Sequence, residues 1–164
     1  MEYVKYPKTL HLPWSEGIGD DDKVLDDLQC FEGKDVIVTE KLDGENTTMY
    51  NDYIHARSID SGYHSSRSRV SAIHGSIGHS IPSGWRICGE NMQAVHSIRY
   101  SELADWFLLY SVWDNANQCL SWSETVEWAE LLGLRTVPVI YSGVMDVESL
   151  KKFHNDLDLS RQEG

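Results

Sequence analysis

Apolar and polar positions predict a strand, a turn and a second strand in the first third of the chain. The β-branched run 35–39 has apolar residues on both faces, which is typical of a buried strand. A turn at Asp43-Gly44 follows, and the β-favouring run 47–50 leaves it. We therefore expect Lys41 at the end of a rigid strand, beside a glycine that lets backbone and ligand approach closely.

The rest of the pattern predicts an α+β fold, with at least one mostly antiparallel sheet in a single domain over residues 1–164. Runs 47–50 and 53–56 flank Asn51-Asp52, which is a hairpin signal. The other expected elements are helices near 24–28, 65–81, 101–106, 123–132 and 147–157, and strands over 85–90, 107–113, 119–122 and 136–141.

Composition fits an ordinary globular protein, with 41% apolar and 24% charged residues. No apolar run reaches membrane-spanning length and the N-terminus has no signal-peptide core, so we expect a cytoplasmic protein. The three cysteines are widely spaced, which favours reduced thiols over a disulfide framework or a zinc site.

The net charge of −12 argues against nonspecific nucleic-acid binding through bulk electrostatics. The charge is uneven, however, because Asp60 is the only acid between His55 and Arg86. This basic segment is a candidate for contact with a phosphate-bearing partner, and Arg67 and Arg69 within it are candidates for RNA binding. A solvated basic loop is the alternative.

Lys41 is a candidate nucleophile. An amine attacks only when deprotonated, and the ordinary lysine pKa is about 10.4. We expect partial burial and a nearby cation to favour the neutral amine, whereas Glu40, Asp43 and Glu45 act in the opposite direction unless a metal ion screens them. The short pattern K-x-D-G, taken alone, fits an ordinary charged hairpin turn better.

Further downstream, Arg57 directly follows a predicted strand, Glu90 ends another, and 107–113 is an aromatic strand. A lysine can attack a phosphorus atom, an arginine can bind phosphate or a sugar hydroxyl, and a glutamate can hold ribose or metal. An aromatic face can stack on a purine. The chain has neither of the common glycine-rich nucleotide-binding loops, so nucleotide binding requires another route.

Five segments in this order resemble the motifs of the covalent nucleotidyltransferases, which include DNA ligases, RNA ligases and mRNA capping enzymes. The chain is most similar to ATP-dependent RNA ligases of the nick-sealing type. The matching segments are Lys41-Leu42-Asp43-Gly44 with Asn46, Ala56-Arg57-Ser58, Cys88-Gly89-Glu90-Asn91-Met92 with 94–98, the strand 107–114, and Glu163-Gly164.

The resemblance implies an α+β nucleotidyltransferase fold, a lysyl-AMP intermediate, ATP, and Mg²⁺ or Mn²⁺. It also implies a substrate with RNA ends or a nick that carries a 5′-phosphate and a 3′-hydroxyl. The implied roles are Lys41 as AMP acceptor, Glu40 at the purine edge, Arg57 near the phosphate or the 3′ end, Glu90 at the ribose, Tyr110 (with Phe107 and Trp113 as competitors) stacked on the base, Asn46 at the water shell of the metal, and Glu163 on the metal.

The chain departs from the family at its end. It stops at the E-G-x-V motif, so we expect it to lack the final strands and the two lysines that grip the triphosphate. The alternatives are a DNA ligase, a capping-type nucleotidyltransferase, and a remnant that binds nucleotide or RNA ends without chemistry.

Overall fold

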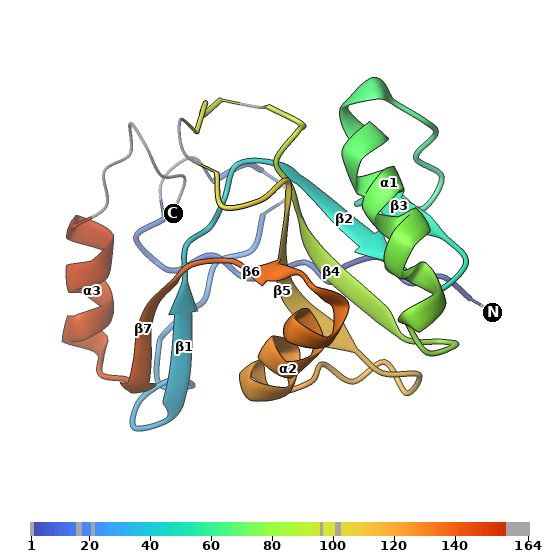
Figure 1. Ribbon diagram of the computed structural model, residues 1–164. Coiled ribbons are helices and arrows are strands. Elements are labelled where there is room, and N and C mark those ends of the chain that lie inside the picture. Colours follow the sequence, from blue (N-terminus) through green and yellow to red (C-terminus); the bar gives the residue numbers. More distant parts are fainter. Residues whose placement is uncertain (1, 16–17, 21, 96, 101–102, 157–164) are drawn as a thin grey trace. The chain divides into compact units, whose positions relative to one another are not determined.

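A computed structural model describes residues 2–15, 18–20, 22–95, 97–100 and 103–156 (Figure 1). The described residues divide into two compact units: those within 2–6 and 40–138 form the larger unit, and those within 7–39 and 139–156 form the smaller one. Both combine strands with helices, so the α+β class is confirmed. That the whole chain acts as one domain stays a prediction.

The larger unit is built on a five-stranded sheet of order β3-β2-β4-β5-β6. Its strands are antiparallel except for β5 and β6, which are parallel. The hairpin predicted around Asn51-Asp52 is present, closed by a hydrogen bond from Tyr50 N to Tyr53 O of 2.8 Å. The strands are β2 (Glu45–Met49), β3 (Ile54–Ala56), β4 (Arg86–Asn91), β5 (Phe107–Trp113) and β6 (Arg135–Thr136).

Helices α1 (Ser68–Ile77) and α2 (Trp122–Leu132) pack on the same face of this sheet. Figure 1 shows α1 beside β2 and β3, and α2 beside β5 and β6. Short 3₁₀ turns, η1 (Ser65–Arg67) and η2 (Gly78–Ser80), flank α1. The shared core cluster contains Met49, Val70, Ile81, Ile87, Phe107, Leu109, Val112, Ala129 and Leu132. One face of the sheet is therefore apolar and covered by helices.

The ends of α2 follow from local chemistry. The Ser121 side chain accepts a hydrogen bond from Glu124 N, and the Glu124 carboxylate accepts one from Ser121 N at 2.9 Å, which makes a capping box. At the other end Gly133 adopts φ 67°, the left-handed conformation that glycine favours. The helix predicted over 123–132 is confirmed and begins one residue earlier.

Two predicted segments have no regular structure. Residues 24–28 were expected to be helical, but Val24 forms a bridge with His11 and turns follow. Residues 103–106 are not helical either, and 101–102 lie outside the described residues. Both segments are too short to nucleate a helix on an apolar face alone.

Two predicted strands are shorter or divided. Residues 119–122 make a single bridge, between Trp113 and Cys119, because α2 begins at Trp122. The strand predicted over 136–141 is split into β6 and β7 (Val139–Val144), which belong to different sheets. Pro138 lies at the break, where it has no N–H to offer a sheet ladder.

In the smaller unit β1 (Asp35–Thr39) pairs antiparallel with β7. The expectation that β1 is buried is wrong: a two-stranded sheet protects little surface, and Ile37 is 37% exposed. Helix α3 (Val147–Asn155) follows β7, and Phe153 contacts the Tyr141 ring with centroids 5.2 Å apart. The predicted last helical residue, Leu157, lies outside the described residues. No helix in the described part of the chain is long and apolar enough to cross a bilayer.

Gly89 is the position in the sheet most sensitive to an added methyl group. A Cβ there lies 2.6 Å from Leu108 O and also overlaps the Phe107 ring. We expect Gly89→Ala to lower the free energy of unfolding by about 1–3 kcal/mol. Gly75→Ala is the matched control, because its Cβ meets nothing within 4 Å and it lies in α1. It should raise stability by about 0.5–1 kcal/mol. Urea denaturation measures both, and equal effects would contradict the close packing.

Candidate functional site

The segment from Glu40 to Gly44 holds a lysine at the surface of the larger unit. Leu42, Asp43 and Gly44 are buried. Lys41, which directly precedes them, is exposed. Leu42 packs in a second apolar cluster with Met92, Leu108 and Val137, and Glu40 N donates to Pro138 O at 2.9 Å. The expectation that the protein partly buries Lys41 is therefore wrong, because its buried neighbours direct their own side chains inward.

Asp43 fixes a neighbouring loop. Its Oδ2 accepts hydrogen bonds from Ser97 N at 2.7 Å, Ser97 Oγ at 2.6 Å and Ile98 N at 2.8 Å. Its own amide donates to the hydroxyl of Tyr100 at 2.8 Å. The acidic residue of the K-x-D-G turn thus serves a structural purpose, and this long-range role was not predicted.

Gly44 brings the turn against β4. Its amide donates to Glu90 Oε1 at 3.2 Å. A Cβ at this position would lie 2.6 Å from the Asn91 carbonyl oxygen. Only glycine fits here without displacing backbone, so the turn that carries Lys41 sits next to the half-buried Glu90 carboxylate.

The face of the sheet away from the helices carries the polar candidates. Strand register aligns Asn46 with Glu90, and Glu90 with Leu108. Between Cys88 and Gly89 the register with β5 shifts, which leaves Tyr110 as the extra residue of a bulge. The Asn46 side-chain amide donates to the Tyr110 hydroxyl. Asn46, Glu90 and Tyr110 are therefore brought together, as the motifs imply.

Arg57 acts electrostatically on the same group. Burial, with smaller contributions from Cys88 and Glu90, raises the pKa of Tyr110 well above its ordinary value. Arg57, exposed just after β3, acts on that pKa in the opposite direction.

Of the two competitors for base stacking, Phe107 is excluded by its position. It is fully buried in the core cluster on the helix side of the sheet. Trp113 is half-buried and has the guanidinium of Arg86 4.6 Å from its ring centroid. Tyr110 thus stays the leading candidate with Trp113 as its competitor, and the stacking role stays a prediction.

One aromatic residue next to Tyr110 was missed. Tyr6 packs edge-on against Tyr110, with ring centroids 5.3 Å apart, and against Trp113 at 6.3 Å. Burial raises the pKa of Tyr6 to about 12. Its sequence neighbourhood of tyrosines and prolines gives no periodic signal that could have revealed this position.

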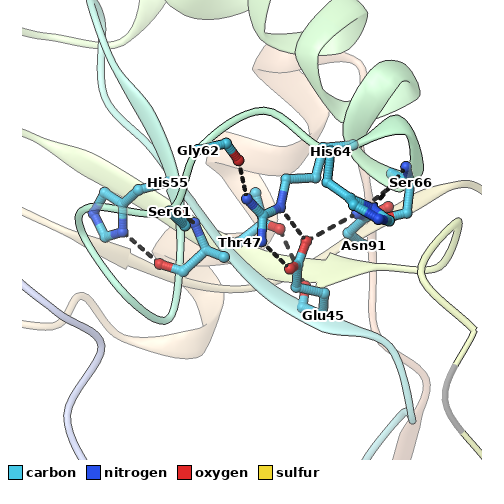
Figure 2. A network of polar contacts seen from close by, with 10 residues as sticks. Glu45, Thr47, His55, Ser61, Gly62, His64, Ser66 and Asn91 are labelled. Atoms are coloured by element: carbon cyan, nitrogen blue, oxygen red, sulfur yellow. Dashed lines mark hydrogen bonds and ion pairs between the residues drawn. The ribbon is translucent and has the colours of Figure 1, made fainter.

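The basic segment divides its arginines between different tasks. Arg67 Nε and Nη2 bind the two carboxylate oxygens of Glu45 at 2.7 and 2.5 Å. Asn91 Nδ2 joins this network by donating to Glu45 Oε1 at 3.4 Å and to Ser66 O at 2.9 Å, as Figure 2 shows for Glu45, Asn91 and Ser66. The guanidinium of Arg67 is thus engaged within the protein.

Arg69 and Glu163 complete the predicted set. Arg69 is exposed, and its Cζ lies 4.1 Å from the ring centroid of Trp106. Glu163, predicted to bind metal, lies outside the described residues. In the part of the chain that the structure describes, no three His, Cys, Asp or Glu side chains form a metal cluster.

Asn46 fits a role beside a hydrated cation. Its Oδ1 is buried and has no hydrogen-bond partner among the described residues, although its Nδ2 is bonded to Tyr110. Leaving a buried acceptor unsatisfied costs about 1–3 kcal/mol. A water molecule held by a divalent ion would satisfy this oxygen.

Comparison with known proteins identifies relatives of this fold. A family model described as RNA ligase matches residues 34–164. A mutant of Naegleria gruberi RNA ligase, solved with ATP and Mn, superposes with a TM-score of 0.55 at 18% identity, over 72% of this chain and 40% of that one. Another mutant of that enzyme, solved with AMP and Mn, gives a TM-score of 0.53 at 16% identity, with the same coverage.

A protein of Aquifex aeolicus assigned as an ATP-dependent DNA ligase gives a TM-score of 0.50 at 20% identity, over 76% of this chain and 36% of that one. The chain therefore spans well under half the length of these proteins. Comparison with curated proteins gives no significant match.

The Glu45–Arg67 pair predicts a pH-dependent contribution to stability. Hydrogen bonds from Arg67 lower the pKa of Glu45 below its ordinary 4.5, so the unfolded state takes up the proton first. The ion pair therefore stabilises the folded state fully above about pH 4.5, and this stabilisation is lost as the pH falls through the lower pKa that Glu45 has in the folded state. We expect Glu45→Gln to cost about 1–3 kcal/mol at neutral pH, and the cost should shrink in acid.

Urea unfolding of wild type and variant, at neutral pH and well below pH 4.5, measures this difference. Glu130→Gln, at an exposed position of α2, is the control and should have a small effect at both pH values. A cost for Glu45→Gln that stays constant with pH would contradict the ion pair.

Proposed function

Since the chain belongs to the RNA ligase family, we propose that it carries the adenylation chemistry of an ATP-dependent RNA ligase. The observation that supports this most is the Gly44–Glu90 contact, which joins the lysine turn to the strand face that carries Asn46 and Tyr110. In this proposal Lys41 is the nucleophile, Glu90 binds the ribose, Tyr110 stacks on the base and Arg57, whose charge acts on Tyr110, binds phosphate.

The proposed first step links Lys41 to AMP. The neutral amine attacks the α-phosphorus of ATP, an N–P bond forms, and the bond to pyrophosphate breaks with the electron pair leaving on pyrophosphate. The amine proton goes to solvent. Because Lys41 is exposed, the bound nucleotide must shield the amine from water before it attacks.

The second and third steps join the strands. A 5′-phosphate of RNA attacks the lysyl-AMP, the P–N bond breaks, and a pyrophosphate linkage to AMP forms. A 3′-hydroxyl then attacks that 5′-phosphate, a phosphodiester forms, and AMP leaves. Glu90 would bind ribose, Tyr110 would stack on adenine, and Glu40 would meet the purine edge. Arg57 would lie near the reacting phosphate or 3′ end, and the exposed Arg69 would approach RNA, whereas Arg67, also predicted to bind RNA, is engaged by Glu45.

A divalent cation, Mg²⁺ or Mn²⁺, offsets triphosphate charge in this chemistry. The unsatisfied Asn46 Oδ1 would accept from its water shell, and Glu163 would complete the site. The N. gruberi enzyme structures with ATP or AMP and Mn support the proposal that the chain uses ATP with a divalent metal. We also propose a cytoplasmic location and a role in RNA repair.

Lys41→Ala tests the first step directly. Incubation with α-labelled ATP and Mg²⁺ should label the wild-type chain through an acid-labile bond, and the substitution should abolish the label because the acceptor amine is gone. Lys34→Ala, which changes another exposed lysine, should label normally. Label that survives Lys41→Ala excludes Lys41 as the acceptor. No label in wild type favours a binding remnant.

Two substitutions of Tyr110 distinguish stacking of its ring on the base from hydrogen bonding by its hydroxyl. Tyr110→Phe keeps the ring but loses the hydroxyl that accepts from Asn46, so the ATP concentration for half-maximal labelling should rise only a few-fold. Tyr110→Ala also loses the ring, and stacking is worth about 1–3 kcal/mol per base, which is roughly a 5- to 150-fold rise. Equal effects of both changes would exclude base stacking on Tyr110.

The nature of the sealed strand is tested with nicks that differ in one nucleotide. A preference for a ribose 3′-OH over a deoxyribose 3′-OH at the nick supports RNA sealing, since the 2′-hydroxyl is what distinguishes them. Equal rates would favour a DNA ligase, an alternative that the likeness to the Aquifex aeolicus protein keeps open.

A further inference from the structure

A cavity in the larger unit is lined by residues that have no role in the proposed adenylation chemistry. It has a volume of about 550 Å³ and is lined by Tyr100, Leu103, Ala104, Asp105, Trp106 and Arg135. Ligand pockets commonly have volumes of about 300–1,000 Å³, so one nucleotide fits a space of this size.

Trp106 gives the cavity an aromatic wall. The residue is 38% exposed, which is high for an indole, and it is fixed by a backbone hydrogen bond from Met92 N to Trp106 O of 2.9 Å. The guanidinium of Arg69 lies 4.1 Å from its ring centroid. Arg69 is itself positioned by its amide, which donates to Gln93 Oε1 at 3.0 Å.

Arg135 supplies a second positive charge at the cavity. It is exposed on β6, where the parallel pairing places it opposite Leu108 of β5. The acidic residue of the lining, Asp105, turns one carboxylate oxygen back to the amide of Trp106 at 2.7 Å. An exposed indole that one arginine contacts, in a cavity that a second arginine lines, is suited to a base that stacks and to phosphates that are bound by charge.

The cavity adjoins the lysine turn. Tyr100, part of its lining, accepts a hydrogen bond from the amide of Asp43 at 2.8 Å. Leu103, also in the lining, packs in the apolar cluster that contains Leu42. A strand that occupies the cavity would therefore pass close to the turn that carries Lys41.

We propose that this cavity binds one nucleotide of a single-stranded RNA segment, with its base on Trp106 and its phosphates between Arg69 and Arg135. Stacking on an indole requires an unpaired base, which favours a single strand over a duplex. The net charge of −12 also favours a single strand, because it opposes binding that depends on the phosphates of a duplex alone. That the bound strand is RNA rests on the proposed function, whereas the presence of a nucleotide-binding cavity does not.

The test measures binding of a fluorescent, 5′-phosphorylated oligouridylate to the full chain by anisotropy at fixed salt. Trp106→Ala should weaken binding by roughly 10-fold, and Trp106→Phe should restore part of it. Arg135→Ala should weaken binding and reduce its salt dependence, because a phosphate contact is lost. Labelling with α-labelled ATP should stay within about two-fold of wild type in all three variants. The substitutions remove contacts to the single strand, and the reaction of the protein with ATP does not use those contacts.

Leu131→Ala and Lys152→Ala, at exposed positions of α2 and α3, are the controls for loss of an apolar and of a positive side chain. Circular dichroism melting confirms that each variant folds. Wild-type affinity in both Trp106→Ala and Arg135→Ala overturns the proposal, as does failure of the wild-type chain to bind the oligonucleotide. Binding that depends on Trp106 in a chain that ATP does not label supports the cavity and contradicts the proposed function.

Discussion

The contact between the amide of Gly44 and the carboxylate of Glu90 is the constraint on which the site depends. The glycine has no room for a side chain, because a Cβ would lie 2.6 Å from the Asn91 carbonyl oxygen. This closeness joins two segments that are 46 residues apart in sequence. It sets the turn that follows Lys41 beside β4, and Asp43 and Leu42, held by Ser97 and the second apolar cluster, fix the turn there.

The two faces of the five-stranded sheet separate the apolar core from residues of the proposed site. Side chains such as Met49, Ile87 and Leu109 point to the helices and form the core. Because strand residues alternate in direction, Asn46 and Glu90 point to the opposite face. The Glu45–Arg67 pair lies on the helix side of β2, one residue from Asn46, so neighbouring residues serve folding and the proposed chemistry separately.

Local sequence was sufficient for elements whose signals are short-range. The strand 107–113, the hairpin around Asn51-Asp52 and helix α2 with its Ser121 and Gly133 ends were all found because residue spacing and capping chemistry define them. Helix α1 was placed by apolar spacing alone, and its ends were less accurate because 3₁₀ turns extend it. Signals as short as those at 24–28 or 103–106 did not suffice, since tertiary contacts decide the conformation of such segments.

The sequence by itself determined the α+β class, the RNA ligase family and the order in which Lys41, Arg57, Glu90 and Tyr110 occur. Only the tertiary structure decided that Lys41 is exposed, that Arg67 is engaged by Glu45 and that Phe107 belongs to the core. It also decided that Tyr6 packs on Tyr110 and that a bulge gives Tyr110 its position. These facts depend on strand register and on contacts between distant segments, and one residue of register moves a side chain from one face of a sheet to the other.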